Sequence, residues 1–230
     1  MGNGIIVPIG DLHLPFLHKP TWEFNLKFIS HLQPEYVVFM GDIYDKYSWN
    51  RFGIRINLNP KHEMDEAFEM YQEMIRAIQI KSPETKIYVI KGNHDQRGIR
   101  QLYERFGPSW TVLASPNDFW SISGANIIHD PKEILYINGI GFTHGHTKFG
   151  SHCPSMEYIR VVIGHLHIGD TRFFRKSNNE LVWEHCTGLL GDPFHEALNY
   201  RPLKKYFNWH HGVSIIDKWG PRFIPLSIYV

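Results

Sequence analysis

The sequence predicts an α/β fold that combines parallel and antiparallel strands. Short apolar runs rich in Val and Ile are typical of buried strands, and longer segments with apolar residues every three or four positions are typical of helices. In the first half of the chain the two patterns alternate, which indicates a largely parallel sheet with crossover helices. In the second half, tight-turn signals separate short strands, which indicates an antiparallel continuation or a second sheet.

Five apolar runs are predicted as strands, and each of them leads into a cluster of polar side chains. The runs span residues 4–10, 36–41, 86–92, 137–143 and 159–164. Two helices are expected between the first three strands. Apolar side chains recur at helical spacing across 21–33 and 61–82, and a proline, Pro34 or Pro83, follows each segment.

Two hairpins are predicted in the second half. Asn138-Gly139 is the strongest short hairpin signal, and the C-terminal strands are expected to turn near residues 219–221. We find no internal repeat and no low-complexity linker. At 230 residues the chain can bury a large core, so residues 1–230 are predicted to form a single domain.

Composition narrows the class of protein. Hydrophobic residues at 43% and charged residues at 20% are ordinary for a globular protein, and no apolar run reaches the roughly 18 residues of a membrane helix. The first residues do not resemble a signal peptide, and two cysteines do not suggest a disulfide framework. A cytoplasmic location without a membrane partner is therefore expected. The net charge of +1 argues against a broad electrostatic grip on duplex nucleic acid.

The polar clusters after the strands carry the functional signal. They consist of Asp11 and His13, Asp42 and Asp45, Asn93 with His94 and Asp95, His144 and His146, and His165 and His167. In an α/β sheet, ligands bind outside the carboxyl ends of the strands, so the clusters are expected to converge on one edge. Side chains two apart on an extended chain point the same way, so Asp11 with His13, and His165 with His167, are expected to face one site.

These side chains offer more nitrogen and oxygen ligands than one tetrahedral metal ion uses, and they suffice for two ions that share a carboxylate. Thiolate motifs are missing, which excludes iron–sulfur and structural zinc sites. Mixed imidazole and carboxylate ligands suit manganese, zinc, iron, nickel or cobalt, and the sequence does not choose among these ions. Manganese is taken as the first expectation. Two divalent ions about 3.5–4 Å apart are the known arrangement for in-line displacement at phosphorus.

The order of the motifs resembles the calcineurin-like metallophosphoesterase family. The resemblance covers about residues 5–167 and rests on five blocks: DLH (11–13), GDIYD (41–45), GNHD (92–95), HGH (144–146) and GHLH (164–167). It implies a four-layer β-sandwich flanked by helices. The protein-phosphatase branch has an Arg-Gly pair after the second block and Glu in the third, and both are absent here. SWNRF (48–52) and NWHHG (208–212) are similar to small phage and bacterial members.

The resemblance also implies roles for individual residues. Asp11, His13 and His167 would hold one metal ion, Asp42 would bridge both, and Asn93, His144 and His165 would hold the second. His94 would protonate the leaving oxygen or stabilise charge on the phosphoryl group, and Asp95 would orient its ring and raise its pKa. A hydroxide made between the metals would be the nucleophile. We prefer His144 over His146 as the ligand, which leaves His146 facing the substrate, supporting a ligand, or in the loop.

Four further roles stay open on the sequence alone. Asp45 either orients a metal ligand or is an ordinary turn residue. Arg97 either clamps a phosphate oxygen or is a solvated residue at a helix start. Tyr44 and Trp49 either stack a nucleic-acid base or plug the rim of the site.

The expected function is phosphoester hydrolysis by a metal-activated hydroxide, with a phosphodiester such as nucleic acid as the leading substrate. One alternative is a phosphomonoesterase acting on nucleotides or other small phosphates. Another is a non-catalytic metal-binding subunit of a nucleic-acid machine. The presence of His94 and of a suitable residue at all seven ligand positions weighs against the last alternative.

Overall fold

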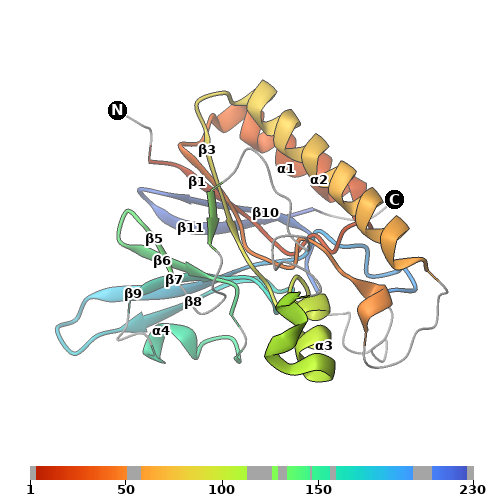
Figure 1. Cartoon of the computed structure of the whole chain (residues 1–230). Helices are drawn as coiled ribbons and strands as arrows, with labels where there is room; N and C mark the ends of the chain where they lie inside the picture. Colours follow the sequence, from red (N-terminus) through yellow and green to blue (C-terminus); the bar gives the residue numbers. More distant parts are fainter. Residues whose placement is uncertain are drawn as a thin grey trace.

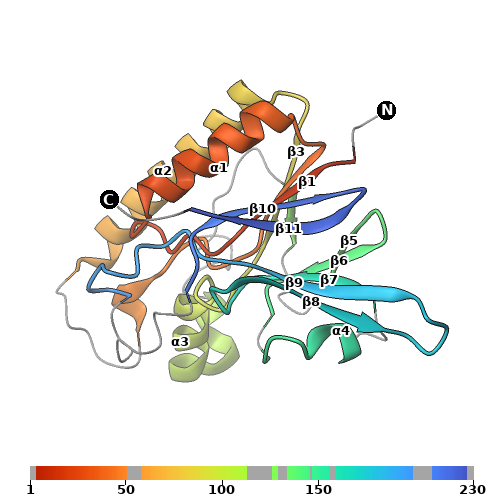
Figure 2. The ribbon, with the colours of Figure 1, turned by 180° about the vertical axis from the view of Figure 1, so that it is seen from behind.

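The computed structural model describes residues 4–50, 58–112, 126–128, 134–145, 147–155, 159–198 and 209–226. Two β-sheets stack face to face, and helices cover the outer face of each (Figures 1 and 2). The four-layer arrangement of mixed sheets that the sequence predicts is thus confirmed.

The first sheet has six strands in the order β11-β10-β1-β2-β3-β4. Strands β1 to β4 run parallel, and the C-terminal hairpin of β10 and β11 adds antiparallel strands beside β1. Lys218 and Trp219 form the turn of that hairpin, close to the predicted place. The strands are β1 (Ile6–Ile9), β2 (Tyr36–Phe39), β3 (Lys86–Ile90), β4 (Asn126–Ile128), β10 (Gly212–Asp217) and β11 (Gly220–Pro225).

The second sheet has five strands in the order β5-β6-β7-β9-β8. The predicted Asn138-Gly139 turn joins β5 to β6, with both residues at positive φ (52° and 75°) as that turn requires. The sequence left open whether the second half continues the first sheet or forms a second one, and both occur. Strands β10 and β11 extend the first sheet, and β5 to β9 form the second. The strands are β5 (Leu135–Ile137), β6 (Ile140–Thr143), β7 (Arg160–Ile163), β8 (Gly169–Arg175) and β9 (Leu181–Thr187).

Both predicted helices are present. Helix α1 (Lys19–Leu32) starts two residues before the predicted point because Pro20 lies in its first turn, where a missing N–H costs little. Helix α2 (Pro60–Lys81) is capped by Asn59, whose side chain accepts from two backbone amides of the first turn. The remaining helical segments are η1 (Tyr47–Trp49), α3 (Arg97–Phe106), η2 (Gly107–Val112) and α4 (His152–Ser155).

Alternation along the strands separates the layers of the core. In β1, Val7 and Ile9 belong to the cluster beneath α1 and α2, whereas Ile6 faces the second sheet. A third cluster, which includes Cys153 and Cys186, lies between the second sheet and α4. Both sheets are thus buried on their facing sides, and this holds their strand ends together at one end of the sandwich.

Within the described ranges, no helix combines the length and apolar character needed to cross a lipid bilayer.

Candidate metal centre

The seven predicted ligands lie close together, and they come from both sheets. Strands β1, β2 and β3 of the first sheet and strands β6 and β7 of the second end at the same side of the sandwich. The predicted convergence on the edge of one sheet is therefore wrong in detail. The site lies where the ends of two stacked sheets meet, so donors can approach it from both layers.

The backbone that delivers the ligands is not extended. His13, Asp42, His165 and His167 all have positive φ, between 48° and 64°. Non-glycine residues rarely adopt this left-handed conformation, and such strain concentrates at functional sites. The prediction that residues two apart meet because the chain is extended is thus wrong. Asp11 and His13 meet in one ligand group, whereas His165 and His167 belong to two adjacent groups, and the backbone turns sharply after the strands at these positions.

Two motif glycines allow the ligands to approach the backbone. A Cβ atom on Gly164 would lie 2.6 Å from Asp11 Oδ1, and one on Gly92 would overlap the carboxylate of Asp42. Any larger residue would displace one of the carboxylates. The glycine before each of these polar clusters therefore has a steric reason that is independent of turn formation.

Asp11, His13 and His167, here termed the first ligand group, are all buried. Their ligand atoms lie within 4.8 Å of one another. His167 Nε2 is 3.0 Å from Asp11 Oδ2 and 3.2 Å from His13 Nε2. His13 Nδ1 donates to Asp45 Oδ2 at 2.8 Å, so Asp45 orients the ring, which decides between its two predicted roles.

Asp42, Asn93, His144 and His165 form the second ligand group. The Asp42, His144 and His165 donors lie within 4.8 Å of one another. His144 Nδ1 donates to the carbonyl of Met40 at 2.7 Å, which turns Nε2 toward Asp42 Oδ2 (3.3 Å) and Asn93 Oδ1 (3.1 Å). The geometry therefore agrees with the preference for His144, whereas His146 lies outside the described residues.

The carboxylates make this site attractive to positive charge. Burial opposes protonation of His144, yet Asp42 and Asp11 raise the pKa of its ring to about 10. Burial alone would raise the pKa of Asp42, but the neighbouring histidines hold it well below its usual range. Burial and the charge of His144 lower the pKa of His165 to about 4, which leaves that ring neutral. A site that holds a proton this tightly also favours a metal cation in the proton's place.

The donor set fits divalent metal ions. Because His13 donates through Nδ1, its Nε2 is free of a proton in the neutral ring and faces His167 Nε2 across 3.2 Å. Two imidazole nitrogens at that distance cannot both carry protons, so at least one lone pair points into the gap. Histidine ligands whose other nitrogen is fixed by a carboxylate or carbonyl, like His13 and His144, are typical of metal sites.

His94 lies beside both groups, but its environment differs from the prediction. Its Nδ1 is 3.2 Å from Asp45 Oδ2 and from the Asp45 carbonyl, and Arg97 Nη2 lies 2.8 Å from its Nε2. Burial lowers the pKa of His94, with Asp42 and Asp45 opposing the shift and Arg97 adding to it. The predicted rise of this pKa is therefore wrong.

Asp95 does not have the predicted role of orienting the His94 ring. Its two carboxylate oxygens accept hydrogen bonds from the backbone amides of Tyr44 (3.0 Å) and Gly92 (2.7 Å). Asp95 thus ties the loop after β2 to the loop after β3. Burial and the charge of Asp42 raise its pKa to about 6. The carboxylate that contacts the ring is that of Asp45.

The predicted substrate residues fall into different places. Trp49 and Arg97 line a hollow of about 120 Å³ together with Asn93 and Arg100, so they border the second ligand group. Tyr44 is only 1% exposed and packs edge-on against Tyr71 in the core. Of the two roles left open for Tyr44, stacking a base is therefore excluded, because a base cannot reach a buried ring.

Sequence reasoning missed the residue that covers the first ligand group. The ring of Trp209 lies edge-to-face against His167, with centroids 4.4 Å apart. The polar cluster NWHHG hinted at this segment, but no ligand spacing linked it to the strand ends. The histidines nearby have other roles. His185 lies between Thr171 and Ser214, and His211 bonds the carbonyl of Gly191.

Comparisons with known proteins place this geometry in context. Two curated relatives, the Gene 54 proteins of Mycobacterium phages L5 and D29, are each 24% identical over 254 aligned positions, covering 96% of this chain and 93% of the relative.

Among solved structures, Vacuolar Protein Sorting 29 from Cryptosporidium parvum has a TM-score of 0.44 at 15% identity, with 98% of each chain covered. The nuclease MPE from Pseudomonas putida has a TM-score of 0.40 at 12% identity, with 96% of this chain and 86% of the other covered. The model of the calcineurin-like phosphoesterase family matches residues 6–225, and this chain belongs to that family.

Proposed function

We propose that this protein is a phosphodiesterase that depends on two divalent metal ions and cleaves nucleic acid. Membership of a phosphoesterase family indicates hydrolase chemistry. The observation that carries the finer proposal is the pair of adjacent ligand groups at the meeting ends of the two sheets, with the Asp42 carboxylate among the donors of the second group. The backbone carbonyl of Asp42 also accepts from the amide of His13 at 2.9 Å, which ties the two groups together.

In this proposal the first ligand group holds one ion, the second holds the other, and Asp42 is shared. Manganese is the first ion to test. When bound, such ions lower the pKa of water and stabilise the charge of the phosphoryl group. The protein's own part is to fix the ligands, through Asp45 on His13 and through the Met40 carbonyl on His144.

His94 is proposed to act on the substrate rather than to bind metal. Its Nε2 lies 4.0 Å from Asp42 Oδ2, close enough to the shared carboxylate to reach a bound phosphate. Asp45 holds Nδ1, so Nε2 is the ring atom that accepts a hydrogen bond from Arg97. Arg97 can turn this donor to a phosphoryl oxygen, and His94 can then donate from Nε2 to the leaving group once its ring carries both protons.

A diester rather than a monoester is supported by the surroundings of the site. The hollow bordered by Trp49, Arg97 and Arg100 flanks the second ligand group. Trp209 borders a different cavity beside the first ligand group. A phosphodiester has two organic arms, and a site with recesses on both sides accommodates both of them.

The proposal is tested by loading the protein with Mn²⁺, measuring bound metal by elemental analysis, and assaying a panel of phosphoesters. We expect two ions per chain and turnover of bis(p-nitrophenyl) phosphate and single-stranded DNA above that of p-nitrophenyl phosphate. For variants that neutralise a carboxylate of the site, such as Asp42→Asn, the matched control is Asp65→Asn on the exposed face of α2. Preference for the monoester would identify a phosphomonoesterase. Two bound ions without any turnover would support a non-catalytic subunit.

A further inference from the structure

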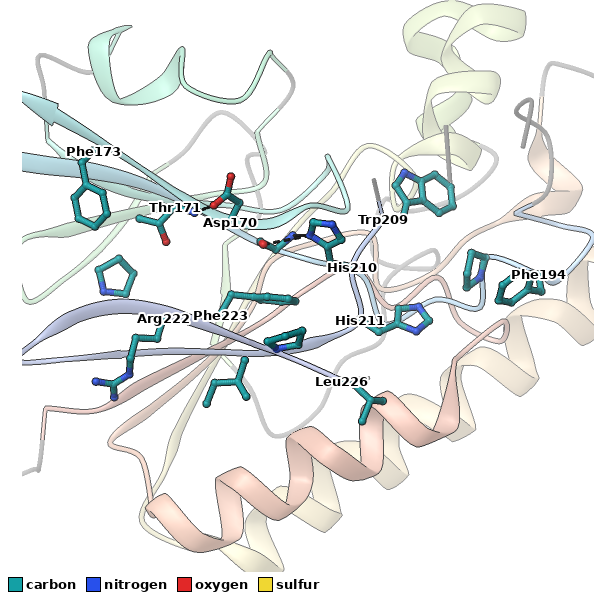
Figure 3. Close-up of a pocket in the computed structure, with 15 residues that line it drawn as sticks. Asp170, Thr171, Phe173, Phe194, Trp209, His210, His211, Arg222, Phe223 and Leu226 are labelled. Carbon is teal, nitrogen blue, oxygen red and sulfur yellow. Dashed lines mark hydrogen bonds between the residues drawn. The ribbon is translucent and has the colours of Figure 1, made fainter. Parts of the chain in front are cut away.

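A large hollow lies at the seam between the two sheets. Its volume is about 770 Å³, within the roughly 300–1,000 Å³ of typical ligand sites. It runs between β8 and β11, the edge strands of the two sheets, which lie side by side (Figure 3). We call this hollow the aromatic cleft, because Phe173, Phe194, Trp209, His210 and Phe223 line it.

One end of the aromatic cleft touches the metal centre. The Trp209 ring forms part of its wall and also packs against the ring of His167 in the first ligand group. The next residue, His210, donates its backbone amide to the carbonyl of His167 at 2.9 Å. A ligand arm that leaves the metal centre past His167 therefore meets the Trp209 ring, which forms part of the cleft wall.

The cleft is built to present flat apolar surface. Three glycines, Gly169, Gly188 and Gly212, leave room for the Phe223 ring, and a Cβ on any of them would collide with it. Phe173 and Phe194 are unusually exposed for their type, at 59% and 78%. Figure 3 shows these two rings at opposite sides of the cleft. Exposed aromatic surface in a recess next to a reactive centre indicates a bound ligand with flat faces.

Charge contributes little here. Arg222 in the cleft is paired with Asp217, and Asp170 adds a negative group. The whole chain has a net charge of only +1. A ligand held by its phosphates alone would need free basic groups, whereas a ligand held by stacking needs aromatic faces.

We propose that the aromatic cleft binds the unpaired bases of a nucleic-acid strand whose scissile phosphodiester lies at the metal centre. This inference rests on the proposed function, since it gives the cleft the arm of the same substrate. Bases in a duplex are stacked on one another, so only a single strand can offer its faces to Phe173, Phe194 and Trp209. The cleft would therefore give the protein a preference for single strands with little dependence on base sequence.

The experiment uses the Mn²⁺-loaded protein and a fluorescein-labelled methylphosphonate oligothymidylate. Its length of about ten nucleotides lies within the range that domains binding single strands typically cover. Its backbone is uncharged and resists hydrolysis, so binding measured by anisotropy reports on the bases. A matching abasic oligomer is the ligand control. We expect Phe194→Ala and Phe173→Ala each to raise the dissociation constant about tenfold, the loss of one base–aromatic stack. Trp219→Ala is the matched variant, because Trp219 is 78% exposed and lies in the β10–β11 turn outside the cleft.

Equal binding of the abasic oligomer, or equal loss in Trp219→Ala, would overturn the inference and would point to an occupant other than bases, such as a peptide. Circular dichroism of each variant separates loss of binding from loss of fold. The two proposals fail separately. Hydrolysis of bis(p-nitrophenyl) phosphate without binding of the oligothymidylate rejects the cleft alone. Binding that depends on Phe173 and Phe194 without any hydrolysis rejects the proposed activity alone.

Discussion

The two ligand groups differ in how the protein holds them. In the first group, all three side chains are buried and a side chain, Asp45, orients the ring of His13. In the second group, a backbone carbonyl, that of Met40, orients His144, and Asn93 and His165 remain half-exposed. The first group can therefore be weakened by changing a residue outside it, whereas the support of His144 comes from a strand end and no substitution removes that carbonyl.

Two carboxylates, those of Asp45 and Asp42, link the ligand groups to His94. The Asp45 carboxylate contacts His13 of the first group, and it also contacts His94 and Arg97 on the substrate side. Asp42 contacts His144 through Oδ2 and accepts the His94 amide through Oδ1. Both carboxylates thus reach His94, but only that of Asp42 is also a ligand of the second group.

The largest effect is expected for Asp42→Asn. In the proposed arrangement both ions share the Asp42 carboxylate, and Asn keeps an oxygen but not the charge. Metal content and diesterase activity should therefore fall together, by more than the roughly 10–100-fold typical of residues that only support a ligand. Elemental analysis and turnover of bis(p-nitrophenyl) phosphate measure both. Retention of two ions with near-normal turnover would show that Asp42 is not the shared ligand.

The next largest effect is expected for His94→Ala. A group that transfers a proton typically contributes about 10²–10⁴-fold, so turnover should fall by that amount while both ions stay bound. If His94 protonates the leaving group, DNA should suffer more than a nitrophenyl ester, whose leaving group departs without a proton. Equal losses on both substrates would assign His94 to charge stabilisation, and loss of metal would make it a ligand. His62→Ala, an exposed histidine on α2, is the control.

Much of this arrangement could be predicted from the sequence, because the ligands follow strands whose apolar pattern is plain. Asp11 lies two residues beyond a short buried strand, and Asp42 and Asn93 each lie three residues beyond one. The partner of His94 could not be predicted. Asp95 is its neighbour in sequence, yet adjacent side chains diverge, and both oxygens of Asp95 bond to backbone amides of the loops. Asp45 reaches the ring from the loop after β2, in which Asp42 has a positive φ.

Aromatic residues near the motifs were ambiguous for a related reason. Tyr44 follows Asp42 by two positions, and the same residue type suits either a core or a rim. The structure buries it beneath α2, whereas Trp49 lies at the edge of a hollow. Trp209 carries no motif spacing at all, and only the packing of its segment against the β7 loop brings it to His167.

Whether residues 1–230 form a single domain stays a prediction.

A smaller and more selective effect is expected for Asp45→Asn. The hydrogen bond of His13 to a carboxylate raises the pKa of that ring, against the effect of burial, and an amide would lose the charge that does so. Affinity for the ion of the first group should fall by about 10–100-fold, with the second ion retained. Isothermal titration with Mn²⁺ separates the two sites. Equal weakening of both ions would show that Asp45 acts on the whole site instead of on His13.

The smallest effect separates the groups without abolishing either. In the native protein a chelator should remove the ion of the second group first, because Asn93 and His165 are half-exposed and the first group is buried. Stopped-flow mixing with EDTA and a metal-sensitive dye measures the rate of Mn²⁺ release, and it should show two phases that differ severalfold in rate. In Asp45→Asn the order should reverse, since His13 then has a neutral amide in place of the charged carboxylate that holds its ring. Two phases with an unchanged order in that variant would mean that burial, and not the Asp45 hydrogen bond, holds the first ion.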